Sequence, residues 1–297
     1  MSRPPTDRYS RLSANYGPYL AEAIAAFTLV FAGCGAVAID STSHGQITHV
    51  GVAITFGLVI AAMIYATGHI SGAHINPVVT LAFALTRHFP FARVPGYWLA
   101  QLVGAAAESG VLRALFGNVA HLGTTLLSNG DGQSFVLESD LTFFLMFVIM
   151  AVATDDRATG QAAALAIGGT VLLDAMFGGP ISGASMNPAR SFGPALASGT
   201  WGHLWVYVLG PVVGALLAAF AYEVVRGNGR IRESRRTRRP RKWLAMRSSP
   251  TSMPTYRRSG WFSPISTVAT PVSRLMGSTA WVIWAAMAAS QTRCRSA

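Results

Sequence analysis

Long stretches of apolar residues, separated by short polar segments, occupy most of the chain between residues 17 and 226. A helix needs about 20 mostly apolar residues to cross a bilayer, because each residue adds about 1.5 Å of length. Six stretches come close to that length. They are Gly17–Ile39, His49–Thr67, Pro95–Phe116, Phe135–Ala153, Gln161–Phe177 and Leu204–Val225. The pattern therefore predicts an all-α membrane protein with six transmembrane helices.

Two further apolar segments, Asn76–Leu85 and Asn187–Ala197, are too short to cross a membrane. Ten helical residues extend about 15 Å, which is half of the hydrocarbon thickness. We therefore predict two half-helices that enter the membrane and stop near its middle.

The two short segments also carry an internal repeat. His69–Leu85 reads HISGAHINPVVTLAFAL and Pro180–Leu196 reads PISGASMNPARSFGPAL, and an ungapped alignment at an offset of 111 residues matches eight positions. An acidic residue recurs near the first span of each half, at Glu22 and Glu138.

Each half of the membrane region, about 17–120 and 135–226, then holds three spans and one half-helix. Because three is an odd number, the two halves must enter the membrane in opposite directions. Such inverted repeats place their site at the interface of the repeats, near the membrane midplane.

The repeated Asn-Pro pairs suit the start of a half-helix inside a membrane. Asn76 and Asn187 can cap the free backbone N–H groups and still keep side-chain N–H donors, while Pro77 and Pro188 follow where a missing N–H costs nothing. A single Asn-Pro pair is usually only the cap of a turn. Two copies at matching places instead predict a pore constriction, where two positive helix ends and two amide donors hold water by its oxygen and repel cations.

Composition supports a membrane protein and excludes a nucleic-acid binder. Hydrophobic residues make up 51% of the chain and charged residues 12%, against about 25% charged residues in soluble domains. The net charge of +11 arises at one end, because residues 226–297 hold fifteen of the 23 Lys and Arg residues. We expect residues 227–297 to form a basic cytoplasmic tail, with binding to anionic lipid as an alternative role.

The positions of most other arginines predict the orientation. Five of them lie before the first span and between the second and third spans, at Arg3, Arg8, Arg11, Arg87 and Arg93. Arg157, between the fourth and fifth spans, agrees with them, whereas Arg113, at the end of the third span, counts weakly against. The positive-inside rule makes that side, which holds both termini and the N-terminal tail 1–16, cytoplasmic. The connections 41–48 and 117–134 are then expected to be exposed on the outer side.

The segments Ser71–Thr80 and Ser182–Ser191, SGAHINPVVT and SGASMNPARS, resemble the paired signature of the aquaporin, or major intrinsic protein, family. The resemblance covers about residues 17–226. It implies six helices with two re-entrant half-helices, assembled as a homotetramer with one pore in each subunit. In this family the midplane residues would be Asn76, Pro77, Val78, Asn187, Pro188 and Ala189. Val78 departs from the usual Ala, and we expect it to narrow the midplane slightly.

The same resemblance implies a selectivity filter on the outer side of the midplane. By alignment its members are Phe56, Ala175, Ala184 and Arg190, and a slip of one residue would put Asp174 or Met176 in place of Ala175. Water-selective members have His where this chain has Ala175, so the filter is expected to be wide. The set is similar to that of plant nodulin-like and bacterial members, which pass glycerol, urea or metalloid acids as well as water.

Other polar residues in the spans receive structural interpretations. The resemblance implies that Glu22 and Glu138 accept hydrogen bonds from the re-entrant loops. Either His69 lines the cytoplasmic vestibule or it is an ordinary structural histidine. Asp174 faces a neighbouring subunit, a buried polar partner or the pore, and the sequence leaves these three alternatives open. The two cysteines, Cys34 and Cys294, lack the spacing of a metal site or a disulfide framework.

The sequence thus predicts a passive channel in the plasma membrane for water and small neutral solutes. It would exclude protons and ions and use no cofactor, metal or nucleic acid. It would not be an enzyme, because no nucleophile–base pair or carboxylate pair is present. The alternative is a secondary transporter, which also uses inverted repeats with broken helices.

Overall fold

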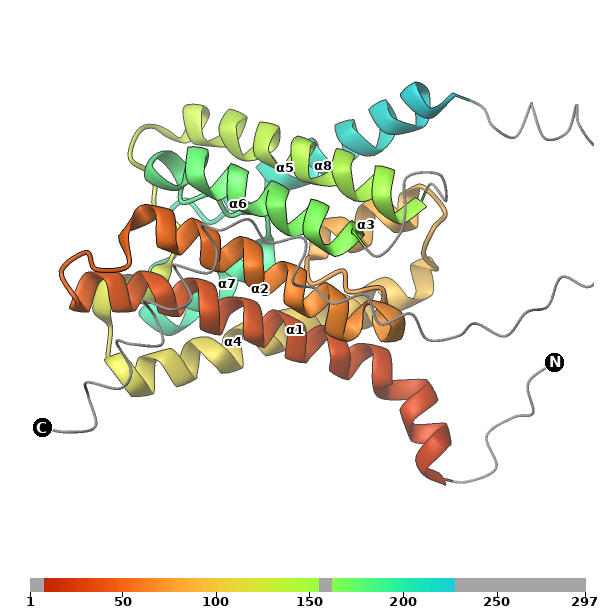
Figure 1. Ribbon diagram of the computed structural model, residues 1–297, viewed down its shortest axis with the longest axis horizontal. Helices are drawn as coiled ribbons and strands as arrows, with labels where there is room; N and C mark the ends of the chain where they lie inside the picture. Colours follow the sequence, from red (N-terminus) through yellow and green to blue (C-terminus); the bar gives the residue numbers. More distant parts are fainter. Residues whose placement is uncertain (1–7, 155–161, 228–297) are drawn as a thin grey trace, which may run out of the picture. The chain divides into compact units, whose positions relative to one another are not determined.

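The computed structural model describes residues 8–154 and 162–227, and within them every regular element is a helix. In chain order the helices are α1 (Arg8–Thr42), α2 (Thr48–Ser71), α3 (Pro77–Leu85), η1 (Phe91–Arg93), α4 (Val94–Phe116), η2 (Val119–Gly123), α5 (Asp131–Thr154), α6 (Ala163–Ser182), α7 (Pro188–Ser198) and α8 (Val206–Arg226). Six of them, α1, α2, α4, α5, α6 and α8, are long and apolar enough to cross a membrane (Figure 1). The predicted membrane fold is confirmed.

The observed helices extend beyond the apolar stretches from which they were predicted. Helix α1 begins at Arg8 rather than Gly17, and α6 continues through Pro180 to Ser182 rather than ending at Phe177. Hydropathy detects only the part of a helix that crosses hydrocarbon, whereas the helix continues into the polar layer. Residues 1–7 of the predicted N-terminal tail and residues 228–297 of the predicted basic tail lie outside the described residues.

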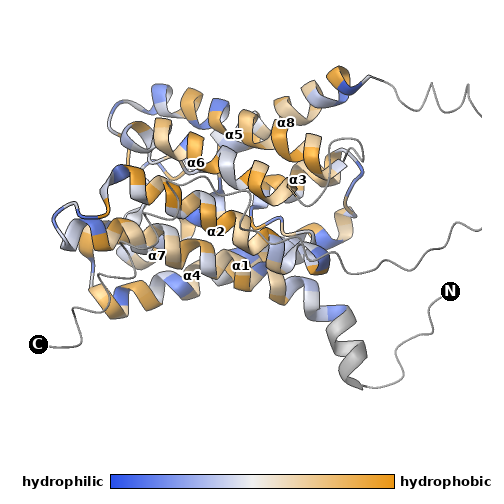
Figure 2. Cartoon of the chain, in the orientation of Figure 1, coloured by the Kyte–Doolittle hydropathy of each residue, from blue (hydrophilic) through white to orange (hydrophobic). Residues whose placement is uncertain are grey.

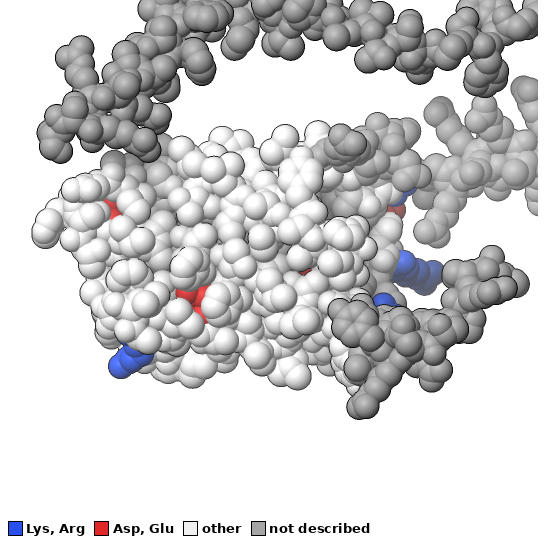
Figure 3. Space-filling view, turned by 60° about the horizontal axis from the view of Figure 1, so that its bottom comes forward, with Lys and Arg blue, Asp and Glu red and all other residues white. Residues whose placement is uncertain are grey.

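The outer surface of the helix bundle is apolar. Leu99, Leu173 and Phe220 are 65%, 67% and 70% exposed, and Figure 2 shows hydrophobic residues along the long helices. On the face shown in Figure 3, Arg side chains lie near the two ends, and the surface between them is uncharged except for a few acidic side chains. A soluble protein rarely exposes so much continuous apolar surface, which suits contact with lipid.

The helices pack in two similar groups. Helix α1 contacts α2 and α4 in the first half, α5 contacts α6 and α8 in the second, and α2 packs on α6 between the halves. At the α2–α6 contact, a Cβ on Gly57 would lie 2.6 Å from the Gly168 carbonyl oxygen, and a Cβ on Gly168 would lie 2.5 Å from that of Gly57. The two backbones therefore touch at a pair of positions where only glycine fits.

Candidate pore and selectivity filter

Each half-helix follows a loop with the same unusual backbone. In the first loop Gly72, Ala73 and Ile75 have φ of 88°, 47° and 57°, and in the second Gly183, Ala184 and Met186 have φ of 83°, 42° and 53°. Left-handed conformations cost a non-glycine residue about 1–2 kcal/mol. Both loops therefore need strong contacts from the surrounding helices.

A buried glutamate supplies such contacts in each half. Glu22 on α1 accepts hydrogen bonds from the backbone N–H groups of His74 and Ile75, at 2.9 and 2.7 Å, and from the Ser71 hydroxyl at 2.7 Å. Gln101 on α4 adds a fourth bond, from Nε2 to the carboxylate at 2.8 Å. The carboxylate thus collects donors of the re-entrant loop that would otherwise be unpaired.

Glu138 on α5 holds the second loop in the same way. Its carboxylate accepts from the backbone N–H groups of Ser185 and Met186, at 2.9 and 2.8 Å, and from the Ser182 hydroxyl at 2.7 Å. Both glutamates are 0% exposed. They lie where the resemblance implied.

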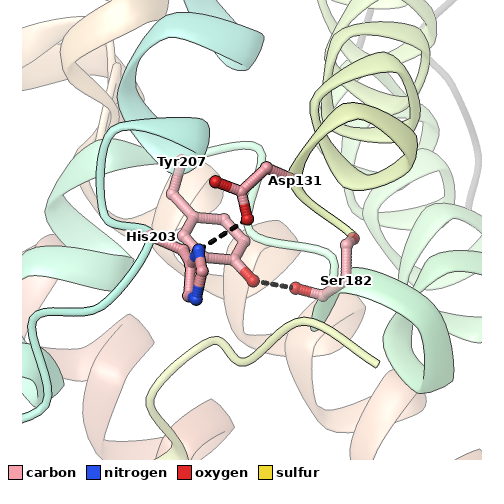
Figure 4. A network of polar contacts seen from close by, with 4 residues as sticks. All are labelled: Asp131, Ser182, His203 and Tyr207. Carbon is pink, nitrogen blue, oxygen red and sulfur yellow. Dashed lines mark hydrogen bonds and ion pairs between the residues drawn. The ribbon is translucent and has the colours of Figure 1, made fainter. Parts of the chain in front are cut away.

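A pair of tyrosines, which the sequence analysis missed, completes the two loop supports. Tyr97 on α4 donates its hydroxyl to the Ser71 carbonyl at 2.8 Å, and Tyr207 on α8 donates to the Ser182 carbonyl at 2.6 Å (Figure 4). Near Tyr207, Nδ1 of His203 lies 2.6 Å from a carboxylate oxygen of Asp131, the first residue of α5. The recurrence of Tyr at nearly the repeat offset was the available signal.

The two Asn side chains cap their own half-helices and also join the two halves. Asn76 Oδ1 accepts from the Val78 N–H at 3.0 Å, and Asn187 Oδ1 accepts from the Ala189 N–H at 3.0 Å. Asn76 Nδ2 donates to the Met186 carbonyl at 2.7 Å, and Asn187 Nδ2 donates to the carbonyl of Ile75 in the opposite loop at 2.9 Å. Each amide still has one N–H that these bonds do not use.

A cavity with room for water molecules, about 140 Å³ in volume, lies where the two halves meet. Its wall is mostly Ile, Leu, Val, Phe and Ala. The polar side chains on the wall are His74, Asn76, Ser185, Asn187 and Arg190. A molecule in this cavity therefore meets an apolar wall with a few fixed hydrogen-bonding groups.

The four positions predicted for the filter all lie on the wall of this cavity. Phe56, Ala175, Ala184 and Arg190 are each less than 9% exposed, and the Arg190 guanidinium carbon lies 5.0 Å from the centre of the Phe56 ring. The neighbours of Ala175 in the chain, Asp174 and Met176, are not on the wall.

The midplane positions divide into two kinds. Asn76 and Asn187 line the cavity, whereas Pro77, Val78, Pro188 and Ala189 are buried in the first turns of α3 and α7. Val79 lines the cavity instead of Val78, so the expected narrowing by Val78 is not seen. His74, rather than the exposed His69, is the histidine on the wall.

The connection 117–134, predicted to be exposed on the outer side, is exposed only in part. Leu122, Thr125 and Ser134 are 0%, 3% and 0% exposed. The Gly123 carbonyl accepts a 2.9 Å hydrogen bond from Arg190 Nη1. The connection turns inward because its polar groups find partners on α7 and at the end of α6, as where the hydroxyls of Thr125 and Ser191 lie 2.9 Å apart and Ser128 donates to the Pro180 carbonyl.

Two buried acids in the spans have no hydrogen-bond partner on the described part of the chain. Asp174 on α6 is 6% exposed and its Oδ2 is unpaired, and both carboxylate oxygens of Glu108 on α4 are unpaired at 0% exposure. Arg190 Nε is also without a partner in the described residues. Only Arg190 among these three faces the cavity.

Comparison with known proteins extends these observations. The chain matches the family described as major intrinsic protein over residues 10–222. It is 54% identical to "Aquaporin NIP1-1" of Oryza sativa subsp. japonica over 208 residues, covering 70% of this chain and 73% of the relative. It is 50% identical to "Nodulin-26" of Glycine max, covering 70% and 77%. In fold it resembles the aquaglyceroporin from Plasmodium falciparum, with a TM-score of 0.64 at 24% identity over 69% of this chain and 94% of the other.

Proposed function

Because this chain belongs to the major intrinsic protein family, it is a passive membrane channel for water and small neutral solutes and not an enzyme, and we propose that these molecules pass through the cavity between its two halves. The proposal rests on the fact that the two midplane Asn residues and the filter residues line one cavity. Both Asn side chains and all four filter positions border the same space.

Asn76 and Asn187 form the midplane constriction in this proposal. Each uses one side-chain N–H to bind the opposite loop, which leaves the other N–H for the oxygen of a passing molecule. The N-termini of α3 and α7 add their partial positive charge at the same place. Two N–H donors and two positive helix ends directed at one place orient water by its oxygen and disfavour protons and cations.

Arg190, Phe56, Ala175 and Ala184 form the selectivity filter. Arg190 is held on one side by the Gly123 carbonyl and on another by the Phe56 ring, so its remaining N–H groups face the solute in a fixed geometry. The two alanines leave space opposite them. We therefore propose that glycerol, urea or metalloid acids pass in addition to water.

The side chains on the cavity wall favour a channel over a coupled transporter. The polar groups of this wall are His, Asn, Ser and Arg, and the described residues that line it include no Asp or Glu to bind a coupling ion. A channel of this kind would give a flux that rises linearly with the solute gradient.

The assembly would be a homotetramer in the plasma membrane, with both termini in the cytoplasm, as the arginine positions suggest. One exposed side chain supports a contact between subunits. Asp140 is exposed on the outward face of α5, between Val136 and Phe144, which are 58% and 56% exposed. A carboxylate facing lipid is costly, so a neighbouring subunit that offers polar groups would favour this arrangement.

The channel region would span residues 17–226, with halves of about 17–120 and 135–226. Residues 1–16 and 227–297 would be its cytoplasmic ends.

The test is light scattering by proteoliposomes after rapid mixing with sucrose, glycerol or urea. The native channel should pass water and at least one of the two small solutes. An Ala175→His variant should keep water flux and lose solute flux, because an imidazole would fill the space beside Arg190. Leu173→Ala, on the exposed face of the same helix, is the control. Solute flux that is equal in Ala175→His and the native channel would disprove the filter assignment.

A further inference from the structure

Helix α6 contains a proline in its last turn. Pro180 has no N–H, so the carbonyl of Met176, four residues earlier, lacks its helical hydrogen bond. The gap directly follows Ala175, the filter position on this helix. Any donor that reaches the Met176 carbonyl therefore acts on the turn that carries a wall residue of the pore.

His49, at the start of α2, supplies that donor. Its Nε2 lies 2.8 Å from the Met176 oxygen, although the two residues are 127 positions apart in the chain. Because a carbonyl oxygen only accepts hydrogen bonds, Nε2 must carry the proton. The bond replaces the backbone donor that Pro180 lacks.

The same turn is packed tightly on both of its faces. A Cβ on Gly179 would lie 2.6 Å from Cε1 of His49, so a glycine is needed to leave room for the ring. On the other face, a Cβ on Gly178 would lie 2.4 Å from Leu141 Cδ1 and 3.3 Å from the Cβ of Ala184, the filter position in the re-entrant loop. The turn is thus placed between His49 and the filter.

A second group holds the turn from the outer connection. Ser128 donates its hydroxyl to the Pro180 carbonyl at 2.6 Å and its backbone N–H to the Ile181 carbonyl at 2.9 Å. These bonds leave the Met176 carbonyl to His49. Two separate segments therefore anchor the end of α6, and His49 is the anchor nearest to Ala175.

We propose that His49 is a positioning residue for the selectivity filter, which fixes the α6 turn between Ala175 and Ala184 by closing the hydrogen-bond gap at Met176. The inference rests on the proposed filter roles of Ala175 and Ala184. His49 is exposed, so water can hydrate the carbonyl when the side chain is lost. The expected consequence is a looser filter rather than an unfolded channel.

The first variant, His49→Phe, keeps a ring over Gly179 and removes the N–H donor. We expect the ratio of glycerol permeability to water permeability to rise about fivefold, the factor that corresponds to one ordinary hydrogen bond. His49→Gln keeps an N–H donor at similar reach and should retain the native ratio. His69→Phe changes an exposed histidine at the other end of α2 and is the matched control.

A second experiment changes Pro180, the residue that leaves the Met176 carbonyl without its helical hydrogen bond. Pro180→Ala restores a backbone N–H for the Met176 carbonyl, so adding His49→Phe to Pro180→Ala should leave the ratio unchanged. Ratios are compared within one liposome preparation, which removes the effect of protein yield. If His49→Phe is not recovered as folded protein, His49→Leu provides the same loss of donor.

Two results would overturn the proposal. One is that His49→Phe changes the permeability ratio by the same factor in the native chain and in Pro180→Ala. The effect would then not pass through the Met176 carbonyl. The other is an unchanged ratio in His49→Phe while Ala175→His still blocks glycerol, which leaves the filter assignment intact. If Ala175→His itself has no effect, the filter assignment fails first and this inference fails with it.

Discussion

The two halves of the channel have the same supports but different walls. In both, a buried glutamate collects loop N–H groups, a tyrosine hydroxyl binds the loop carbonyl, and an Asn caps the half-helix while binding the opposite loop. Apart from the paired Asn and a pair of Ala, the side chains that line the cavity do not match in this way. The repeat therefore keeps what builds the loops and varies most of the wall.

The repeat offset of 111 residues makes this difference explicit. It relates Phe56, Ala175, Ala184 and Arg190 to four positions of the other half that also lie on the cavity wall. They are Ile167, Ile64, Ala73 and Val79. These four repeat-related positions, which we call the inner ring, are all apolar, whereas the proposed filter, which we call the outer ring, holds an arginine and an aromatic ring. We therefore propose that selectivity arises at the outer ring, although the scaffold is nearly symmetric.

The largest expected effect tests the supports. Glu138→Gln puts an NH₂ group against the N–H groups of the second loop, and at least one buried donor loses its acceptor. We expect the free energy of unfolding to fall by about 3 kcal/mol and water flux to be largely lost. Thermal unfolding in detergent and water flux in liposomes measure both. Glu223→Gln, on the exposed face of α8, is the control and should change neither.

The same change in the first half should be about as costly. Whichever Glu22 oxygen becomes an NH₂ group, the backbone N–H of His74 or of Ile75 loses its acceptor. The Gln101 amide can turn over, since its Oε1 has no hydrogen-bond partner in the described residues, but that gives the loop N–H no new acceptor. We expect Glu22→Gln to lower the free energy of unfolding by about 3 kcal/mol, and a loss below about 1 kcal/mol would show that the first loop does not depend on this carboxylate.

The second effect concerns the two rings. Arg190→Val replaces the arginine of the outer ring with the residue type found at the equivalent position of the inner ring, Val79. At about 6 Å and an effective dielectric constant of about 20, one charge repels a passing cation by about 3 kcal/mol. Its loss should raise cation or proton leakage about a hundredfold, measured with a pH-sensitive dye inside liposomes. Val79→Ala, at the equivalent inner position, should leave leakage unchanged, and similar leakage in both variants would contradict the asymmetry.

The supports and the rings differ in how far sequence could predict them. The length of the apolar stretches predicted the six spans, and the two Asn-Pro pairs predicted the half-helices. Both features depend only on residue types along a continuous segment. Tyr97 and Tyr207 could also have been found from their recurrence. The contact of Arg190 with Gly123 could not, because a backbone carbonyl has no sequence signature and the polar connection 117–134 resembles any exposed loop.

Sequence likewise could not separate the two neighbours Val78 and Val79, since which one faces the cavity depends on how α3 is rotated. Nor could it connect His49 with Met176, because that bond joins distant helices through a carbonyl that Pro180 leaves free. The predicted part of the site consists of side chains in a repeated motif. The unpredicted part consists of backbone groups and their distant partners.

A third, smaller effect tests the connection that holds Arg190. Gly123 has φ of 68°, and a Cβ there would lie 2.9 Å from Cys34 Cβ. Gly123→Ala should lower the free energy of unfolding by about 1–2 kcal/mol and displace the carbonyl bound to Arg190, which alters the glycerol-to-water ratio. Gly117→Ala is a close control, because φ is 69° but no atom lies within 4 Å of its Cβ. An equal change of the ratio in both variants would assign the effect to backbone strain alone.

The smallest expected effect distinguishes a residue that supports the half-helix, Val78, from its neighbour that lines the cavity, Val79. Val78 is 3% exposed and its contribution to the Asn76 cap comes from the backbone N–H, which Val78→Ala keeps. Loss of two buried methyl groups should cost about 1.5 kcal/mol, with water and glycerol flux unchanged. Val79→Ala should cost a similar amount of stability but raise glycerol flux, because Val79 lines the cavity. If Val78→Ala raises glycerol flux as much as Val79→Ala does, Val78 narrows the pore after all, and the division between supporting and lining residues fails at the midplane.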